Sequence, residues 1–399
     1  MRLSSIAAVV AAGTSLGLAA KVVMERRRAP PLPRGSAADA PAVAVLLPVR
    51  DEEHDVLPCV ETLLSQSLPP FVLVVDDGSS DRTRGLVEGR ARGEERLAVV
   101  EAGGLPGGWG GKVHALAVGE AELVRRGVVA EWIVTTDADT RHGPELLARA
   151  LAAARGYGLD AVSVAGRQEA KGVAENVSTP AVYALLDLLL GDWREAAAGG
   201  GPAVANGQLV LVRREALAAI GGFGAVRGAL IDDVALAGRL REAGFSTGFF
   251  RAPQHLHIRM YRGGRETFRG WRRNLGGLLA GRPWTLAAAL AGLLAPPLAV
   301  AALILRGRRA AAAWTWAAGA AASAALRATA GQQAAWALLY PADALALAAT
   351  LTAGVSDRLR GAPAVWKGRR IGSGSGGCGA AGGGEARGPQ PIAGATSRT

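Results

Sequence analysis

The sequence of 399 residues contains only two cysteines, Cys59 and Cys378. They lie far apart, and Cys378 is in a glycine-rich stretch, which excludes a disulfide framework and a cysteine-based metal site. Zinc-ligand spacing, an RNP pattern and a basic zipper are also absent. We therefore expect no nucleic-acid partner. The net charge of +11 instead favours anionic lipids or phosphorylated substrates.

Charged residues are scarce too, at 20% against 50% hydrophobic, and the mean hydropathy is +0.20. This balance is too apolar for an ordinary soluble protein. Residues 3–24 are apolar except for Lys21, and the sequence Glu25-Arg26-Arg27-Arg28 follows. Only Arg2 precedes the apolar stretch, so we favour a membrane anchor over residues 1–28 rather than a cleaved signal peptide. The basic cluster after the span predicts that the following residues are cytoplasmic.

The C-terminal third predicts a membrane region over residues 276–357. Its apolar stretches are 285–305, 310–326 and 334–354. If all three crossed, Arg306–Arg309 and the basic segment 358–370 would both lie outside, against the positive-inside rule. We expect the first stretch to turn back at Pro296-Pro297, which would keep both basic segments cytoplasmic. The predicted location is therefore the cell membrane, as a multi-pass protein with its large domain in the cytoplasm.

Between these regions, a linker over residues 29–41 leads to a segment of alternating strand and helix patterns over residues 42–275. The strands are expected at 43–47, 72–75, 97–100, 132–136, 160–164 and 209–212, and helices at 55–67 and 80–92, from 144 and from 234. This alternation predicts an α/β fold with a mostly parallel central sheet flanked by helices. Residues 358–399 are expected to be a basic segment and a disordered, glycine-rich tail.

A pair of carboxylates follows one of the predicted strands, in the sequence Thr135-Thr-Asp-Ala-Asp139. Alternate residues of a strand point the same way, so Asp137 and Asp139 are expected to face one pocket. Two close carboxylates repel each other unless a cation lies between them, and such oxygen ligands suit Mg²⁺ or Mn²⁺ on a diphosphate. A single pair of this kind is more often a solvated acidic turn.

Two further polar sites also fall at predicted strand ends, Arg50–Glu52 and Asp76–Asp81. The carboxyl ends of parallel strands meet at one edge of a sheet, where ligands bind, so these three sites together favour a functional site. His255 and His257 are the only histidines at strand spacing, and one of them is considered as a further metal ligand. His54, His114 and His142 are expected to be surface or helix residues.

An arginine-rich stretch follows, with Tyr261 and Trp271 among its residues. Its arginines are Arg259, Arg262, Arg265, Arg269, Arg272 and Arg273. They suit lipid head groups or a substrate diphosphate, and a solvated basic helix at the membrane surface is the alternative. The apolar segment 180–193 is too short to span a membrane and is expected to be a core or interfacial helix.

Taken in order, five of these motifs resemble family 2 glycosyltransferases, which have the GT-A fold. They are Pro48-Val-Arg-Asp-Glu52, Val75-Asp-Asp-Gly-Ser-Ser-Asp81, Gly110-Gly-Lys112, Asp137-Ala-Asp139 and Ile231-Asp-Asp233. The resemblance covers about residues 42–275. Within the family, Leu105–Lys112, Tyr261–Trp271 and Trp366–Arg369 resemble the membrane-bound branch associated with hopanoid and carotenoid pathways.

The resemblance implies metal-dependent transfer of a sugar from a nucleotide-diphospho-sugar, with inversion and with UDP favoured as the nucleotide. Asp137 and Asp139 would hold Mg²⁺ or Mn²⁺. Asp233 matches the catalytic base, and Asp232, which stands where a Glu is usual, is the second candidate. The donor-binding set is Pro48, Arg50, Glu52, Asp76, Asp77, Lys112 and Asp137. The predicted acceptor and membrane surface is Arg269, Trp271 and Arg272.

Processive polysaccharide synthases of this family carry Gln-x-x-Arg-Trp, whereas this chain has Glu266-Thr-Phe-Arg269-Gly-Trp271. The difference favours a single transfer to a lipid acceptor at the cytoplasmic membrane face over polymer synthesis. A non-catalytic membrane protein that retains a nucleotide-binding fold is the alternative from another class. A nucleotidyltransferase would need a basic, glycine-rich loop near the first strand, and Pro48–Glu52 is acidic.

Overall fold

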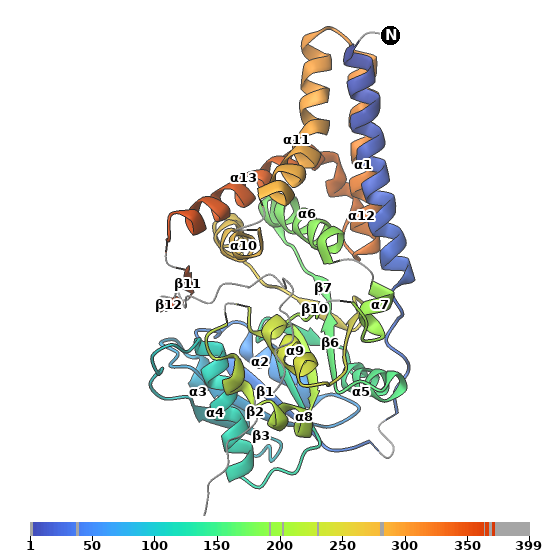
Figure 1. The fold of residues 1–399 in the computed structure, drawn as a ribbon. Helices are drawn as coiled ribbons and strands as arrows, with labels where there is room; N and C mark the ends of the chain where they lie inside the picture. The colour runs from blue at the N-terminus through green and yellow to red at the C-terminus, as the bar shows by residue number, and fades with distance from the viewer. Residues whose placement is uncertain are drawn as a thin grey trace, which may run out of the picture.

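The computed structural model describes residues 3–36, 40–190, 193–201, 203–229, 231–279, 283–362, 364–366 and 369–371. The predicted disordered tail beyond residue 371 and two residues of Trp366–Arg369 lie outside this set. An α/β domain occupies one end of the molecule, and long helices project from it (Figure 1). A layer of helices that includes α6, α10 and α13 lies between these two parts (Figure 1).

The central sheet has seven strands in the order β3-β2-β1-β4-β8-β6-β9, and only β8 is antiparallel to its neighbours. Their bounds are β1 Val43–Val49, β2 Phe71–Asp76, β3 Leu97–Glu101, β4 Trp132–Thr136, β6 Ala161–Ala165, β8 Leu209–Arg213 and β9 Thr247–Arg251. The predicted α/β architecture with a mostly parallel sheet is therefore confirmed. The register pairs Val49 with Asp76, so the polar residues that follow β1 and β2 lie side by side.

Helices cover both faces of this sheet, because its strands are almost continuously apolar. One core lies under α2 (Val56–Leu64), α3 (Thr83–Ala91) and α5 (Leu146–Tyr157). The other lies under α4 (Gly111–Arg125), α8 (Arg214–Ala219), the 3₁₀ turn η1 (Phe223–Val226) and α9 (Asp232–Glu242). The two cores hold the carboxyl ends of β1, β2 and β4 at one edge.

A three-stranded sheet, in the order β5-β10-β7, closes this edge toward the helical layer. Its strands are β5 Thr140–His142, β7 Arg167–Gln168 and β10 Leu256–Ile258. The backbone N–H of Arg259 donates to the carbonyl of Asp139 at 2.9 Å, which extends the pairing of β5 with β10. The small sheet therefore fixes the backbone beside Asp139.

The layer between the two parts contains α6 (Gly172–Leu190), the short helix α7 (Trp193–Ala197), α10 (Gly264–Leu279) and α13 (Tyr340–Leu359). Of the apolar segment predicted at 180–193, residues 180–190 form the second half of α6, which begins well before Pro180. A proline leaves the carbonyl four residues earlier without its helical donor. Here that carbonyl, of Asn176, accepts a hydrogen bond of 2.9 Å from Arg327 Nη2, so the helix continues through the proline.

The projecting helices are α1 (Leu3–Arg28), α11 (Pro283–Leu305) and α12 (Arg309–Thr329), which pack along one another. The expected turn at Pro296-Pro297 is wrong, because α11 continues through both prolines and α12 returns beside it (Figure 1). Pro296 is buried against neighbouring helices, which is how apolar helices tolerate proline. Chain segments after α12 are the 3₁₀ turn η2 (Ala334–Leu339), α13, and strands β11 (Ala364–Trp366) and β12 (Arg369–Ile371).

Helices α10 and α13 approach so closely that their backbones touch at two glycines. A Cβ on Gly354 would lie 2.3 Å from the carbonyl oxygen of Arg272 and 3.0 Å from the backbone nitrogen of Gly276. A Cβ on Gly270 would similarly collide with the ring of Tyr261. The glycine that separates Arg269 from Trp271 is therefore required by packing.

We predict that Gly354→Ala forces α10 and α13 apart, because the added methyl group meets backbone atoms that cannot rotate away. The expected loss of stability is about 1–3 kcal/mol, measured as a lower thermal midpoint in detergent. Gly292→Ala in α11 is the matched control, since a Cβ there meets no atom within 4 Å. Equal midpoints for the two variants would contradict the close contact.

Candidate active site

Three of the predicted donor-binding residues meet where β1 and β2 end. Asp76 and Asp77 are each 2% exposed. Asp76 accepts hydrogen bonds from the backbone and hydroxyl of Ser79, which turns the chain after β2. Arg50 Nη1 donates to the carbonyl oxygen of Asp77 at 2.6 Å and lies 3.7 Å from its Oδ2 atom. Pro48 lies in β1 beside them, and the Glu52 backbone N–H donates to Thr83.

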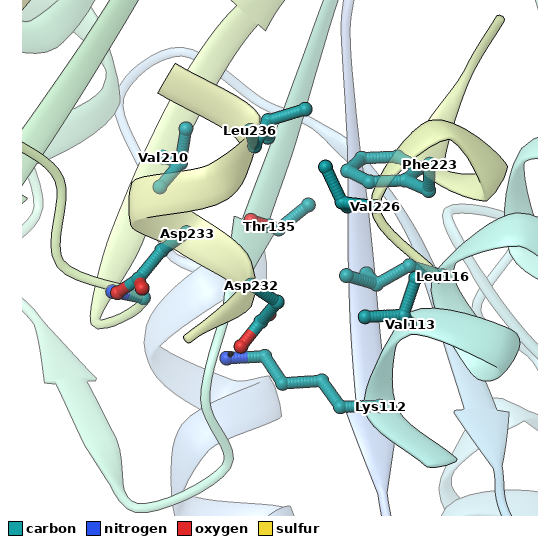
Figure 2. A pocket seen from close by; sticks show the side chains of 11 residues that line it. Lys112, Val113, Leu116, Thr135, Val210, Phe223, Val226, Asp232, Asp233 and Leu236 are labelled. Atoms are coloured by element: carbon teal, nitrogen blue, oxygen red, sulfur yellow. Dashed lines mark hydrogen bonds and ion pairs between the residues drawn. The ribbon is translucent and has the colours of Figure 1, made fainter. Parts of the chain in front are cut away.

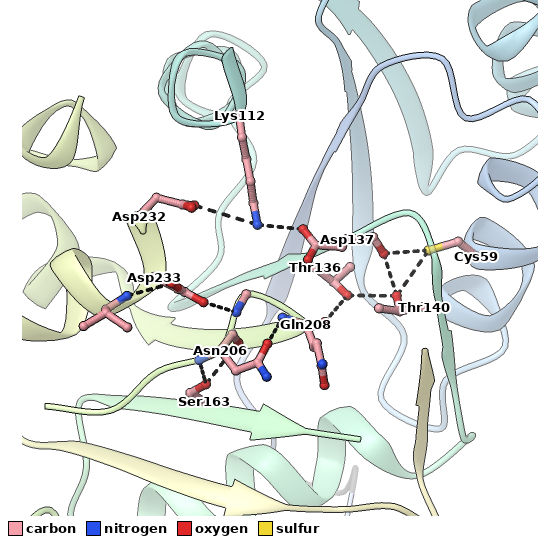
Figure 3. A network of polar contacts seen from close by, with 12 residues as sticks. Cys59, Lys112, Thr136, Asp137, Thr140, Ser163, Asn206, Gln208, Asp232 and Asp233 are labelled. Carbon is pink, nitrogen blue, oxygen red and sulfur yellow. Dashed lines mark hydrogen bonds and ion pairs between the residues drawn. The ribbon is translucent and has the colours of Figure 1, made fainter. Parts of the chain in front are cut away.

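Lys112, in the first turn of α4, joins two of the predicted acidic motifs. Its Nζ atom lies 2.6 Å from Asp137 Oδ1 and 3.8 Å from Asp232 Oδ2 (Figure 3). Burial alone would lower the pKa of Lys112, but the carboxylates of Asp137, Asp232 and Asp233 together raise it above its ordinary value. The lysine is therefore a fixed cation between the end of β4 and the start of α9.

Asp233 is held by backbone N–H groups on both of its oxygens. Its Oδ2 atom accepts from Gly207 and its Oδ1 atom accepts from Val234 at 2.8 Å. Desolvation, followed by the neighbouring charge of Asp232, raises the pKa of Asp233 to about 7. A small pocket lies beside it, with apolar walls from α4, η1 and α9 (Figure 2). Such a carboxylate is oriented and suited to accept a proton near neutral pH.

Asp139, one of the two predicted metal ligands, lies in a strongly negative environment. Its Oδ1 atom is buried and has no hydrogen-bond partner within the described part of the chain. Burial, then the charges of Asp137, Glu52 and Asp55, raise the pKa of Asp139 to about 8. A cation beside Asp137 and Asp139 would offset this negative charge, so the pair fits a divalent metal.

The side chains that the structure describes do not by themselves complete a metal site. Among the described residues, no group of three or more His, Cys, Asp or Glu side chains is arranged to hold a metal. This agrees with a metal that takes most of its oxygen ligands from a bound diphosphate and water. His257, one of the two histidines considered as a further ligand, instead contacts Glu169 at 3.3 Å in the small sheet.

Gly207 lies where the catalytic candidates converge, and no sequence pattern singled it out. A Cβ there would lie 2.7 Å from Lys112 Nζ, 3.4 Å from Asp233 Oδ2 and 3.6 Å from Asp137 Oδ2. Only an apolar strand after Asn206-Gly207-Gln208 was visible in the sequence. The antiparallel pairing of β8 with β4 brings this glycine between β4 and α9.

Aromatic side chains from the helical layer lie above this edge. Trp271 makes edge-to-face contacts with Tyr183 and Tyr261, each with ring centroids 5.5 Å apart. Tyr183 accepts a hydrogen bond of 3.2 Å from Gln208, which follows Gly207.

Of the predicted acceptor residues, Arg269 is exposed, whereas Trp271 is only 4% exposed and packs inside the helical layer. Arg272 is paired with Asp357 of α13.

A family model described as "Glycosyltransferase like family 2" matches residues 41–269, which is more than half of the chain. The chain belongs to this glycosyltransferase family. It is thus an enzyme of the glycosyltransferase class. Its predicted GT-A fold agrees with the structure of the mannosyltransferase described below. No match was found among curated proteins.

Several solved structures are similar in fold. A mannosyltransferase from Pyrobaculum calidifontis, in complex with GDP-Man and Mn²⁺, is 23% identical with a TM-score of 0.54, over 90% of this chain and 99% of the other. Glucosyl-3-phosphoglycerate synthase from Mycobacterium tuberculosis, with Mn²⁺ and UDP, is 19% identical with a TM-score of 0.39, over 61% and 79%. TarS 1–349 of S. aureus, with UDP-GlcNAc, is 13% identical with a TM-score of 0.41, over 84% and 97%.

In this glycosyltransferase, a buried polar network supports the turn that carries Asp137 and Asp139. His142 lies in β5 and is 4% exposed, so the expectation of a surface or helix residue is wrong. Its ring nitrogens lie 3.0 Å from the hydroxyls of Thr62 and Thr136. Thr140 donates to the carbonyl of Asp137 at 2.6 Å, and the buried thiol of Cys59 lies beneath it.

We predict that Gly207→Ala lowers the rate of sugar transfer by about 100-fold while the protein stays folded. The new Cβ meets the flexible end of Lys112, so the ammonium group moves rather than the backbone. Nucleoside diphosphate release and the thermal midpoint are the two measurements. Gly238→Ala in α9, where a Cβ meets nothing within 4 Å, should leave both unchanged. Wild-type activity in Gly207→Ala would contradict the close approach of Lys112 and Asp233 to this glycine.

We predict a pH dependence of stability from His142, whose pKa burial lowers from 6.5 to about 3 in the folded protein. Between these values the unfolded chain binds more protons, so stability decreases as the pH falls below about 6.5, by up to about 1.4 kcal/mol per pH unit. The thermal midpoint measured from pH 7.5 to 4.5 should therefore fall more steeply for the wild type than for His142→Gln. The exposed His54→Gln control should follow the wild type. Parallel curves for all three proteins would contradict the assignment.

Proposed function

We propose that this glycosyltransferase moves one sugar from a nucleotide-diphospho-sugar to a lipid-type acceptor at a membrane surface, with inversion at the anomeric carbon. The observation that carries the proposal is the Lys112 bridge between Asp137 and Asp232, directly beside the oriented carboxylate of Asp233. This Lys112 bridge joins the proposed donor-binding edge of the sheet to the candidate base. The nucleotide-sugars and Mn²⁺ named for the similar structures support this assignment.

The donor is proposed to bind along the carboxyl edge of the sheet. Asp76, Asp77 and Arg50 would contact the nucleoside, because they surround the ends of β1 and β2. Lys112 would meet the diphosphate with its ammonium group. Asp137 and Asp139 would hold Mg²⁺ or Mn²⁺, which when bound stabilises the charge on the leaving diphosphate. UDP and GDP both remain candidate nucleotides, since each occurs in the similar structures.

The proposed catalytic base is Asp233. An inverting transfer needs one group that takes the proton of the acceptor hydroxyl. Both oxygens of Asp233 are oriented by backbone N–H groups, and its raised pKa of about 7 makes proton uptake favourable. Asp232 lies nearer to Lys112 and is suited to hold that cation in place. This division of roles favours Asp233 as the base.

The acceptor is proposed to be a lipid at the cytoplasmic membrane face. Among the described residues, three helices are long and apolar enough to cross a membrane, and the aromatic cluster of α6 and α10 lies between them and the site. The exposed Arg269 suits lipid head groups. We also propose membership of the membrane-bound branch associated with hopanoid and carotenoid pathways, on the motifs Leu105–Lys112 and Tyr261–Trp271. Product length separates this function from processive polymer synthesis.

The test is nucleoside diphosphate release by membranes that contain the protein, with UDP- and GDP-sugars, Mn²⁺ or Mg²⁺, and a lipid extract. We predict metal-dependent release that needs the lipid extract and yields a product with one added sugar. Asp233→Asn should lower the rate by about 100-fold or more, because the amide cannot accept the proton. The control Glu242→Gln changes an exposed carboxylate on the same helix and should retain full activity.

Three outcomes would contradict parts of the proposal. Equal transfer to water-soluble acceptors would exclude the lipid acceptor. Full activity of Asp233→Asn would exclude it as the base and move the test to Asp232. No turnover of any donor by the folded protein would favour the non-catalytic alternative.

A further inference from the structure

We propose that α1, α11 and α12 cross the bilayer, and that α13 lies along the membrane surface together with α6 and α10. Hydropathy and length favour a different set, because in the described residues they select Ala8–Arg28 of α1, the whole of α11 and the segment Ala334–Leu359, which contains α13. Helix α12 is less hydropathic, since most of its residues are alanine. This assignment concerns the membrane and does not depend on which acceptor the enzyme uses.

Apart from Lys21 of α1 and the charged helix ends, the exposed side chains of α1, α11 and α12 are mostly apolar. Exposed side chains on them include Val10, Leu16, Leu298, Leu305 and Trp314. Helix α12 exposes alanines along one side, at positions 313, 317, 321 and 325. Its Thr315 hydroxyl donates to the carbonyl of Ala311 within the helix, so it does not require water. These three helices therefore present a hydrocarbon-like surface on the outside of the bundle.

The uncharged lengths of these helices match the thickness of a bilayer. Residues 285–305 carry no charge and span about 31 Å at 1.5 Å per residue, and residues 310–326 span about 26 Å. The hydrocarbon core of a bilayer is about 30 Å thick. Arginines 306, 308 and 309 lie at the outer turn, and α12 ends near Arg327. Charges thus bracket each uncharged stretch.

Helix α13 cannot enter hydrocarbon without taking α10 with it. The two helices touch at Gly354 and Gly276, and Arg272 of α10 pairs with Asp357 of α13. Half of the most apolar stretch of Ala334–Leu359 is buried inside the protein, against 11% of the corresponding stretch of α11. Because α10 carries exposed arginines such as Arg265 and Arg269, the pair belongs at the polar surface of the membrane. Figure 1 shows α13 running across the direction of the bundle.

Buried ion pairs mark the level where the bundle meets the helical layer. Arg26 of α1 pairs with Asp187 of α6, which also pairs with Arg251 at the end of β9. Arg26 also donates to Thr329 at the end of α12 at 2.9 Å, so both helices leave the apolar region at one level. The catalytic domain and α13 lie on this side, and the start of α1 and the turn between α11 and α12 lie on the other (Figure 1).

The resulting topology agrees with the positive-inside rule better than one in which α13 also crosses. The catalytic side carries Arg26–Arg28, the arginines of α10 and those that end α13. The opposite side carries the outer turn at Arg306–Arg309. The larger basic charge on the catalytic side predicts that this side is cytoplasmic. It also places the aromatic cluster at the level of lipid head groups.

The test is labelling of single cysteines by a membrane-impermeant maleimide in sealed vesicles of known orientation. All variants carry Cys378→Ser, and this parent protein controls for the buried Cys59. The reporters are Arg306→Cys in the outer turn, Ala334→Cys after α12 and Ala362→Cys after α13. Val129→Cys, in an exposed loop of the catalytic domain, marks the catalytic side. Each variant is accepted only if it retains the parent rate of nucleoside diphosphate release.

We expect Ala334→Cys and Ala362→Cys to label from the same side as Val129→Cys, and Arg306→Cys from the opposite side. Labelling of Ala334→Cys together with Arg306→Cys would show that α12 does not cross. Labelling of Ala362→Cys together with Arg306→Cys would show that α13 crosses. Labelling of all four from one side would show that α11 does not cross. Each of these three results would overturn the proposal.

Discussion

The arrangement of the site depends on one partly buried cation among carboxylates. Asp137, Asp232 and Asp233 come from the end of β4 and the start of α9, and they would repel each other at such short range. Lys112, in the first turn of α4, lies among them and pairs with Asp137 at 2.6 Å. Gly207, opposite Lys112, keeps this space free of a side chain. The same contact therefore joins the proposed donor edge to the proposed base.

The helical layer is tied to this site by contacts of the same kind. Arg327 satisfies the carbonyl that Pro180 leaves free in α6, and Asp187 of α6 is paired with arginines of α1 and β9. Tyr183 of the same helix bonds to Gln208 beside the site. A motion of the catalytic domain relative to the bundle would break these buried pairs. These ion pairs and hydrogen bonds therefore set the distance of the active site from the apolar helices.

Much of the fold was predictable, because local patterns carried the information. Short apolar runs indicated the strands, and their alternation with helices indicated a mostly parallel sheet. The predictions that failed involved contacts between distant segments. The turn at Pro296-Pro297 is absent because neighbouring helices support α11 through its prolines. Trp271 is buried because α6 and α13 cover it, and His142 is buried because Thr62 and Thr136 provide partners for its ring.

The sequence by itself determined the acidic motifs at the strand ends, the alternation of strands and helices, and the presence of long apolar helices. These features depend on residue type and spacing within one segment. Tertiary structure alone decided that Gly207 lies between Lys112 and Asp233, that α12 packs into the bundle, and that α13 is fixed to the arginine-rich α10. These features depend on packing between segments far apart in the chain, for which a single sequence holds no local signal.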